Sequence, residues 1–460
     1  MVMPVLESKK LLRKTDYEGS FEMAMKLHLD NPALRDTFES VKETLPGAGQ
    51  DWVLDTRQAA MDKFTMVGIP GPKVEEWKYT RLGFLTSEGF APATQEDHAE
   101  EIKQYFDQAY RPDLAGHVLV FVNGIINQNL SFCPSDREID VAIFSENTIE
   151  FRGTLVPVED SSPLNNLNRA LVTDGYHIDV PAGKTLTHPV QIIHIVTRGT
   201  DLQAVRTRAQ VNVGAGAKAE IIESFLGAEG ERYWSHMVSD IILAPKAELS
   251  LYQFQLQGRQ AIHMTELHSS VAAEAKFNQM SLQLGAEVSR TELINSFTGE
   301  NAVVDLRGAY LGRVKQSHDI FTRINHDMPH CNSNQLFRGV LDEGGTSAFQ
   351  GKVVVAQDAQ KTNADQSNKN LLLSRKAEAN AKPELLIYAD DVKCSHGATV
   401  GELDTDQLFY LKSRGLDEAA AKGLLVEAFI SEVFDDLSDD KLKDSFKAKT
   451  AGWLNTQVVS

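Results

Sequence analysis

The chain has 460 residues, of which 42% are hydrophobic and 24% are charged, and its formal net charge is −18. This length and composition are typical of a globular protein with two or three folded regions, and they exclude a largely disordered chain. The acidic balance disfavours nucleic acid and membrane surfaces as partners, because both are themselves anionic.

The first residues and the cysteines point to the cytoplasm. The opening MVMPVLESKK lacks the apolar core of a signal peptide, and nowhere do 18 apolar residues follow one another without charge. The three cysteines, Cys133, Cys331 and Cys394, are odd in number and far apart. They predict neither a disulfide framework nor a four-thiolate metal site, and they fit a reducing compartment.

Residues 1–112 are predicted to form an N-terminal helical region. Apolar residues recur with helical period between residues 16 and 68, from Phe21, Met25 and Leu27 onward. Gly68 then acts as a stop signal, and a second, charged helix is predicted over residues 95–110.

Residues 113–402 are predicted to be a stack of β-strands. Short β-branched runs alternate with Gly, Pro and Asn, and one phrase recurs in which a small-residue turn and a charged residue lead into a strand. The charged positions, Lys218, Glu248 and Lys276, are 30 and 28 residues apart. Repeats of this length without helices predict a β-solenoid. The alternative is a β-sandwich, whose Asn-Gly and Asp-Gly hairpin turns are scarce here.

Residues 403–460 are predicted to be helical again. Asp404 with Gln407 forms a capping-box pattern for a helix that ends at Gly415, and Asp417 caps the next helix. That next helix carries an apolar stripe made of Leu424, Leu425, Ala428, Phe429, Val433 and Phe434. The stripe needs a covering surface, either the protein's own core or a partner chain.

The segment ADDVKCSHGATVGELD, residues 389–404, is the sharpest chemical signal. On a strand, Cys394 and His396 project from the same face, because side chains alternate. Thiolate and imidazole both ligate iron, so this pair is a candidate metal or iron–sulfur site. Two ligands are too few for tight binding and imply further ligands from another chain. The alternative is a structural pair, a small buried Cys beside a hydrogen-bonding His.

Other motifs predict no enzyme site. His326 and His330 have the spacing of a zinc-binding helix, but Pro329 opposes a helix there, and a corner of the solenoid is favoured around Cys331. GTSAFQGKV at 345–353 departs from the P-loop pattern, and GAGA at 214–217 does not open a helix. ATP would therefore be bound by a partner.

Several longer strings together resemble the SufB/SufD family, and they cover most of the chain from about residue 70 onward. These strings are EEWKYTRL (75–82), RTELINSFTGENA (290–302), LRGAYLG (306–312), HDMPHCNSNQLFRGVL (326–341), FQGKVVVAQDAQKTNADQSNKNLLLS (349–374) and KPELLIYADDVKCSHGATVGELDTDQLFYLKSRGL (382–416). The chain is more similar to the SufD branch, because the SufB branch carries more cysteines early in the chain.

The resemblance implies a right-handed parallel β-helix between two helical regions, and a non-catalytic scaffold subunit. It implies a heterodimer with SufB through the β-helix, and SufC ATPase subunits docked on the C-terminal helices. Cys394 and His396 would then lie at the SufB interface, where a transient iron–sulfur cluster forms. The chain alone is expected to hold no tight cofactor, with ATP bound through SufC. The sequence does not decide whether a reduced flavin also binds the complex.

Two further expectations concern the chain without SufB and the competing function. An exposed terminal coil would offer unpaired backbone groups, so the isolated chain is expected to form a homodimer. The competing function is a β-helical polysaccharide-active enzyme, which would need an acidic or calcium-binding cleft.

Overall fold

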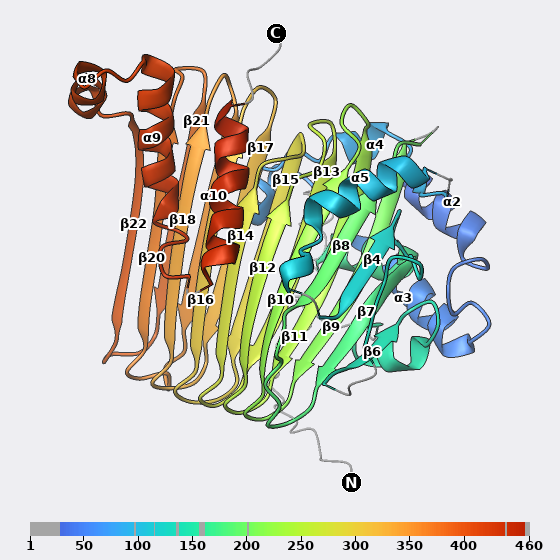
Figure 1. The fold of residues 1–460 in the computed structure, drawn as a ribbon. Coiled ribbons are helices and arrows are strands. Elements are labelled where there is room, and N and C mark those ends of the chain that lie inside the picture. Colours follow the sequence, from blue (N-terminus) through green and yellow to red (C-terminus); the bar gives the residue numbers. More distant parts are fainter. Residues whose placement is uncertain are drawn as a thin grey trace.

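The chain folds into a parallel β-solenoid with helical regions before and after it in sequence (Figure 1). The computed structural model describes residues 28–95, 98–114, 116–134, 138–155, 162–199, 202–437 and 439–455. The first part of the predicted N-terminal helical pattern, residues 16–27, lies outside these described residues. The mainly β, solenoid fold class predicted from the sequence is confirmed.

In the described residues, two sheets of ten strands each form the walls of the solenoid. The strands of sheet 1 are β4 (Val118–Val122), β5 (Ile125–Ile126), β8 (Val190–Val196), β10 (Lys218–Gly227), β12 (Glu248–Gln255), β14 (Lys276–Gln283), β16 (Val303–Gly312), β18 (Asn332–Leu341), β20 (Asn363–Leu372) and β22 (Lys393–Glu402). The strands of sheet 2 are β3 (Ala91–Pro92), β6 (Asp140–Ile143), β7 (Asp174–Val180), β9 (Gln203–Val213), β11 (Tyr233–Leu243), β13 (Ile262–Val271), β15 (Val288–Phe297), β17 (Ser317–His326), β19 (Thr346–Val355) and β21 (Glu378–Ile387). From β7 onward the chain alternates between the two sheets.

The register of the strands follows the repeat seen in the sequence. Lys218 pairs with Glu248, and Glu248 pairs with Lys276, in parallel neighbouring strands. The three charged positions are therefore equivalent places on successive coils, as predicted. Parallel pairing of this kind rules out the β-sandwich, whose sheets are antiparallel.

The interior of the solenoid is filled by alternate residues of both sheets. Leu249, Phe277 and Val304 stack in register along sheet 1 and are completely buried. Toward the C-terminal end, the same column continues as Ser333 and Ala364. This column is thus apolar in the early coils and becomes polar or small in the last ones.

Helices surround the two sheets, and most of them pack on an outer face of a sheet, whereas α8 has no buried residue. They are α2 (Pro32–Val41), α3 (Asp51–Val67), α4 (Phe84–Ser87), α5 (Ala99–Ala109), α6 (Arg152–Leu155), α7 (Pro163–Leu171), α8 (Thr405–Ser413), α9 (Glu418–Ser431) and α10 (Asp440–Asn455), with short 3-10 turns at Glu75–Trp77, Pro112–Leu114 and Thr148–Phe151 and a small pair of strands, β1 (His28–Leu29) and β2 (Ile69–Pro70). The helices α2, α3, α4 and α7 pack on the sheet 2 side around Trp234, whereas α5, α9 and α10 pack on sheet 1 (Figure 1). No helix of the described residues is long and apolar enough to cross a membrane.

The helix α7 departs from the prediction that residues 113–402 contain only strands and turns. Pro163 occupies its first turn, and the Ser162 hydroxyl accepts a hydrogen bond from the Asn165 backbone N–H at 3.0 Å. Asn168 is buried and donates through its side-chain amide to the backbone oxygen of His236 at 2.9 Å. The helix is stable because it is capped and bonded to sheet 2, although its sequence is rich in asparagine.

The two C-terminal helices begin at the predicted capping residues, and α9 ends at Ser431, before the predicted stripe residues Val433 and Phe434. The Asp404 carboxylate accepts from the backbone N–H groups of Asp406 and Gln407, and Asp417 accepts from that of Ala420. Gly415, at φ 98°, provides the left-handed residue that ends the first helix. Figure 1 shows α8 projecting beyond the end of the solenoid, next to β22.

Candidate functional site at the terminal coil

The last coil of the solenoid, residues 378–402, leaves the end of both sheets uncovered in the described part of the chain. Here this segment is called the terminal coil. Among the described strands, β21 pairs only with β19, and β22 pairs only with β20. Tyr388 is 65% exposed and Val400 is 48% exposed. Unpaired backbone groups and exposed apolar side chains together make this end a surface suited to another chain.

Cys394 and His396 lie on the inward face of the edge strand β22. In the register of the sheet, Cys394 is beside Ala364 and His396 is beside Gln366, and both neighbours on β20 are buried. Ala364 packs against Val353 of the opposite sheet, which identifies this face as the interior one. The thiol and the imidazole therefore share a face that opens at the uncovered end.

The two side chains have different surroundings. Cys394 is half-buried and packs against the apolar cluster of the last coils, whereas His396 is exposed. Burial raises the pKa of the Cys394 thiol, a backbone hydrogen bond at Ala364 partly offsets this, and the Asp365 carboxylate raises the pKa further. The thiol is therefore protonated at neutral pH until a metal ion displaces its proton.

Gln366 is a third polar residue at this site, and the sequence analysis missed it. Its side chain is 3% exposed, and neither amide atom has a hydrogen-bond partner among the described residues. It extends toward Gly351 of β19, where an added Cβ would lie 1.9 Å from the amide nitrogen. The signal that could have found it is a polar residue at an inward position of the alternating pattern, in register with His396.

The other cysteines and histidines singled out from the sequence lie elsewhere. Cys133 is exposed. His326 is buried in the interior, where its Nε2 shares a hydrogen bond with the Ser333 hydroxyl at 2.8 Å and burial lowers its pKa to about 4. His330 sits in the corner turn at φ 61°, and the Cys331 thiol donates to the Gly299 carbonyl at 3.3 Å.

The predicted solenoid corner around Cys331 is confirmed. Within the part of the chain that the structure describes, no group of three or more His, Cys, Asp and Glu side chains could hold a metal ion.

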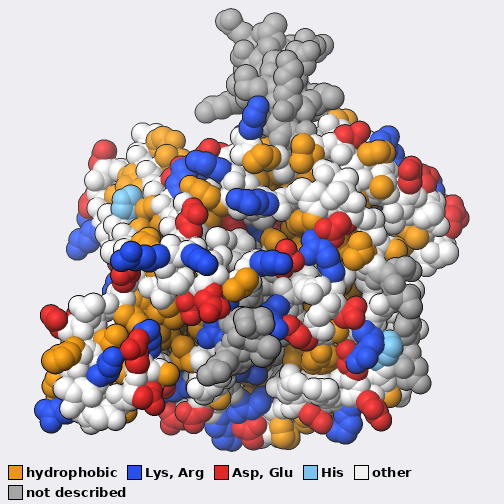
Figure 2. All heavy atoms as spheres, turned by 90° about the horizontal axis from the view of Figure 1, so that it is seen from above, with side chains coloured by type: hydrophobic (Ala, Val, Ile, Leu, Met, Phe, Trp, Pro, Cys, Tyr) orange, Lys and Arg blue, Asp and Glu red, His pale blue; other side chains and the backbone are white. Residues whose placement is uncertain are grey.

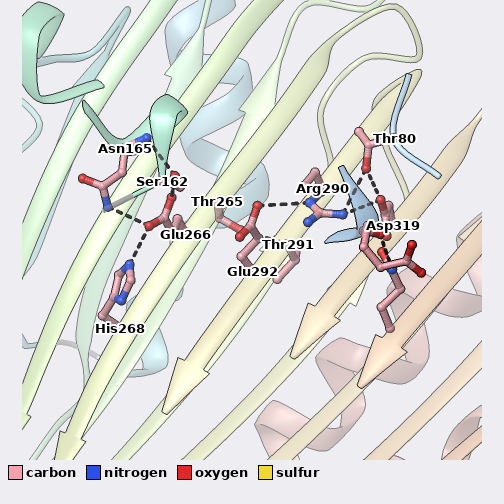
Figure 3. A network of polar contacts seen from close by, with 12 residues as sticks. Thr80, Ser162, Asn165, Thr265, Glu266, His268, Arg290, Thr291, Glu292 and Asp319 are labelled. Carbon is pink, nitrogen blue, oxygen red and sulfur yellow. Dashed lines mark hydrogen bonds and ion pairs between the residues drawn. The ribbon is translucent and has the colours of Figure 1, made fainter. Parts of the chain in front are cut away.

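A network of buried charges lies between sheet 2 and the N-terminal region, on β13, β15 and β17 (Figure 3). The Glu266 carboxylate accepts hydrogen bonds from Ser162 Oγ at 2.8 Å, Asn165 Nδ2 at 2.7 Å and His268 Nε2 at 2.5 Å. Burial alone would raise the pKa of Glu266, but these contacts lower it to about 2. Glu266 is therefore a charged anchor for α7.

Arg290 is the centre of the second half of this network. Its Nε donates to Glu292 at 3.1 Å and its Nη1 donates to Asp319 at 2.6 Å, and all three side chains are buried. Burial raises the pKa of Glu292 to about 7, although Arg290 opposes the shift. Arg290 and Asp319 also bond to the Thr80 hydroxyl, which lies 210 residues before Arg290 in the chain. A contact over this distance has no local sequence pattern that would reveal it.

The apolar stripe of α9 is divided between the core and the surface. Val433 and Phe434, just beyond the helix, are buried against sheet 1, and Glu432 binds the Arg338 guanidinium with two contacts of 2.8 Å. Leu424 is 48% exposed. The protein's own core covers only one side of the stripe, and the alternative of a partner chain stays open for the other side.

The uncovered side of the stripe forms a groove of about 490 Å³ between α8 and α9. Its lining comprises Asp406, Gln407, Tyr410, Leu411, Leu424, Leu425 and Ala428. None of the α8 residues, all of which the structure describes, is buried. Hydrophobic side chains are visible at the lower left of Figure 2, where these helices lie. The groove is a second surface suited to a partner.

Fold and site together define a β-solenoid protein that presents a thiol and an imidazole at an open end. Residues 194–429 match the family described as "SUF system FeS cluster assembly, SufBD core domain", and residues 30–192 match "SufBD protein N-terminal region". The chain therefore belongs to the SufBD family of the SUF iron–sulfur cluster assembly system, as the resemblance in its motifs predicted.

Relatives with known names support this assignment. An iron–sulfur cluster assembly SufBD family protein of Synechocystis is 31% identical, over 85% of this chain and 89% of its own length. The iron–sulfur cluster assembly protein SufD of Escherichia coli is 30% identical, over 85% of this chain and 91% of its own length. Protein ABCI7, chloroplastic, of Arabidopsis thaliana is 26% identical over 98% of both chains. The family match and the SufD relative place the chain in iron–sulfur cluster assembly as a SufD-type subunit, and they give no support to the polysaccharide-active alternative.

Proposed function

We propose that this chain is a non-catalytic scaffold subunit that supplies Cys394 and His396 to a nascent iron–sulfur cluster at its interface with a SufB-type subunit. The observation that carries the proposal is the position of the two side chains on the inward face of an edge strand at the uncovered end of the solenoid. A partner that adds to β21 and β22 would bring its own ligands to this pair.

The ligand count supports a shared and transient site. Iron–sulfur clusters are held by four protein ligands, and this end of the chain offers two. A site completed only by a second chain releases its cargo more readily than a complete one. The cluster is then the product that the complex builds, and the chain alone holds no tight cofactor.

The groove between α8 and α9 is proposed to bind the SufC-type ATPase. An exposed apolar groove next to Tyr410 and Leu424 suits an amphipathic helix or loop of a partner. ATP would act through that partner, and a reduced flavin bound to the assembled complex is compatible with the same arrangement. We place the complex in a reducing compartment, the cytoplasm, where thiols such as Cys394 persist.

Site-specific photo-crosslinking tests both interfaces in the complete complex. The photoreactive residue p-benzoylphenylalanine is introduced in place of Tyr388 in the terminal coil, in place of Phe409 on α8, and, as the control, in place of Phe132. All three native side chains are exposed, by 65%, 74% and 62% respectively. The chain is co-expressed with the SufB-type and SufC-type subunits and irradiated.

We expect a different crosslinked product at each position. The probe at Tyr388 should join the SufB-type subunit, the probe at Phe409 should join the ATPase, and the probe at Phe132 should join neither. A SufB-type crosslink that forms at Phe132 and not at Tyr388 would place the interface elsewhere and overturn the assignment of the terminal coil.

A further inference from the structure

A second cavity lies far from Cys394, between the N-terminal segment and the corner turns of the solenoid. Its volume is about 550 Å³, within the range usual for small-molecule sites. One wall is the segment from Lys78 to Phe84, and the opposite wall includes the turns that carry Lys315 and Gly344. These turns follow strands of sheet 1, which end at the top of Figure 1, so they lie on the face seen in Figure 2.

The N-terminal wall of this cavity is fixed by the buried network of Figure 3. The Trp77 ring stacks on the Arg290 guanidinium, 4.1 Å from its centre, and the Thr80 hydroxyl is hydrogen-bonded to Asp319 and to Arg290 Nη1. Trp77 and Thr80 are both buried. The residues between and after them, by contrast, line the cavity. Arg290 therefore holds the backbone of this segment in one position.

The cavity is locally cationic in a chain whose net charge is −18. Four basic side chains line it, Lys78, Arg81, Arg232 and Lys315. Arg232 is neutralised by Glu88 and by Glu287, at 2.5 and 2.8 Å. The other three form no ion pair with any residue that the structure describes, and the only acidic residues of the lining are Glu287 and Glu378.

Figure 2 shows Lys and Arg side chains across the middle of this face. Lys78 interacts electrostatically with Glu75, so the uncompensated positive charge of the lining rests mainly on Arg81 and Lys315, which a bound anion would stabilise.

We propose that this cavity binds a phosphate-bearing small molecule of nucleotide size. Arg81 and the two lysines supply the charge-assisted donors that phosphate oxygens accept. Tyr79 and Phe84 supply aromatic surface for a planar ring in the same cavity. The cavity shares Glu378 and Asn380 with the terminal coil but uses neither Cys394, His396 nor the groove of α8 and α9, so binding by the isolated chain tests it separately from the proposed cluster function.

Isothermal titration calorimetry on the full chain tests the proposal with two probes, ADP and inorganic pyrophosphate. The test variant is Arg81→Gln with Lys315→Gln. The matched control is Lys184→Gln with Lys246→Gln, which removes the same charge from turns that lead from sheet 2 to sheet 1, at the opposite corner. Far-UV circular dichroism checks that both variants keep the β-rich fold.

We expect saturable binding of ADP, tighter than that of pyrophosphate, because the ring adds contacts with Tyr79 and Phe84. The test variant should weaken ADP binding at least tenfold, and the control should change it less than twofold. Absence of saturable ADP binding would overturn the proposal. Equal weakening by the test and control pairs would also overturn it, because the effect would then be one of overall charge.

Discussion

The groove between α8 and α9 allows ATPase docking to be separated from folding with one substitution, Leu424→Asp. Full burial of a leucine side chain is worth about 1.5–3 kcal/mol. Leu424 is 48% exposed, so covering it on docking contributes roughly 1 kcal/mol. A carboxylate in the apolar groove adds a desolvation penalty. We therefore expect ATPase affinity to fall at least about tenfold, which corresponds to ~1.4 kcal/mol.

Substitutions on the two sides of the stripe should differ in their effect on the free energy of unfolding. Leu424→Asp changes a surface position, so the free energy of unfolding should stay within ~0.5 kcal/mol of wild type. Phe434→Ala removes a ring that is 1% exposed and should cost about 3–5 kcal/mol. The assays are surface plasmon resonance with the SufC-type ATPase and urea unfolding followed by circular dichroism. Unchanged ATPase affinity, or loss of the fold in Leu424→Asp, would refute this division of the stripe.

Three other predictions follow from the buried groups and the terminal coil. The pKa of Glu292 is raised in the folded state, so the unfolded chain loses this proton at a lower pH than the folded chain does. The free energy of unfolding of wild type relative to Glu292→Gln should therefore fall by on the order of 2–3 kcal/mol as pH rises from about 4.5 to about 7, measured by urea unfolding. A difference that does not change with pH would contradict this. Gln366→Met should raise the unfolding free energy by about 1 kcal/mol or more, since it removes a buried unpaired amide, yet lower cluster yield; an unchanged yield would remove Gln366 from the site. The isolated chain should self-associate in sedimentation velocity, and Val400→Lys should shift it toward monomer; a strict monomer at high concentration of wild type would argue against pairing through the terminal coil.

The solenoid could be predicted from the sequence because its signal is local and repeated. Each coil returns to the same turn chemistry, so equivalent positions such as Lys218 and Glu248 can be aligned by eye, and the pairing follows that alignment. Capping residues such as Asp404 and Asp417 accept hydrogen bonds from backbone groups within three positions, so the starts of the C-terminal helices could also be predicted from the sequence. The short α7 was not, because its asparagines gain their partners only from sheet 2.

The shared face of Cys394 and His396 could be predicted, whereas the groups around them could not. Strand alternation places residues i and i+2 together, whichever sheet they join. Gln366 reaches the same site only through the pairing of β20 with β22. Likewise, Thr80 meets Arg290 across 210 residues of sequence. Contacts of this kind depend on the complete stack of coils and have no local sequence signal.

The most direct test of the central claim measures cluster assembly and stability in the same set of variants. Cys394→Ala and His396→Ala are compared with Ser395→Ala, whose native side chain lies between them and bonds to Asp365 on the exposed face. Each variant is assayed by complementation of a strain that lacks the native subunit, and by a thermal melting curve of the purified chain. We predict that Cys394→Ala and His396→Ala impair growth that depends on iron–sulfur enzymes, that Ser395→Ala does not, and that all three variants melt near wild type. Full complementation by the double variant Cys394→Ala with His396→Ala would contradict this and leave the chain a purely architectural subunit.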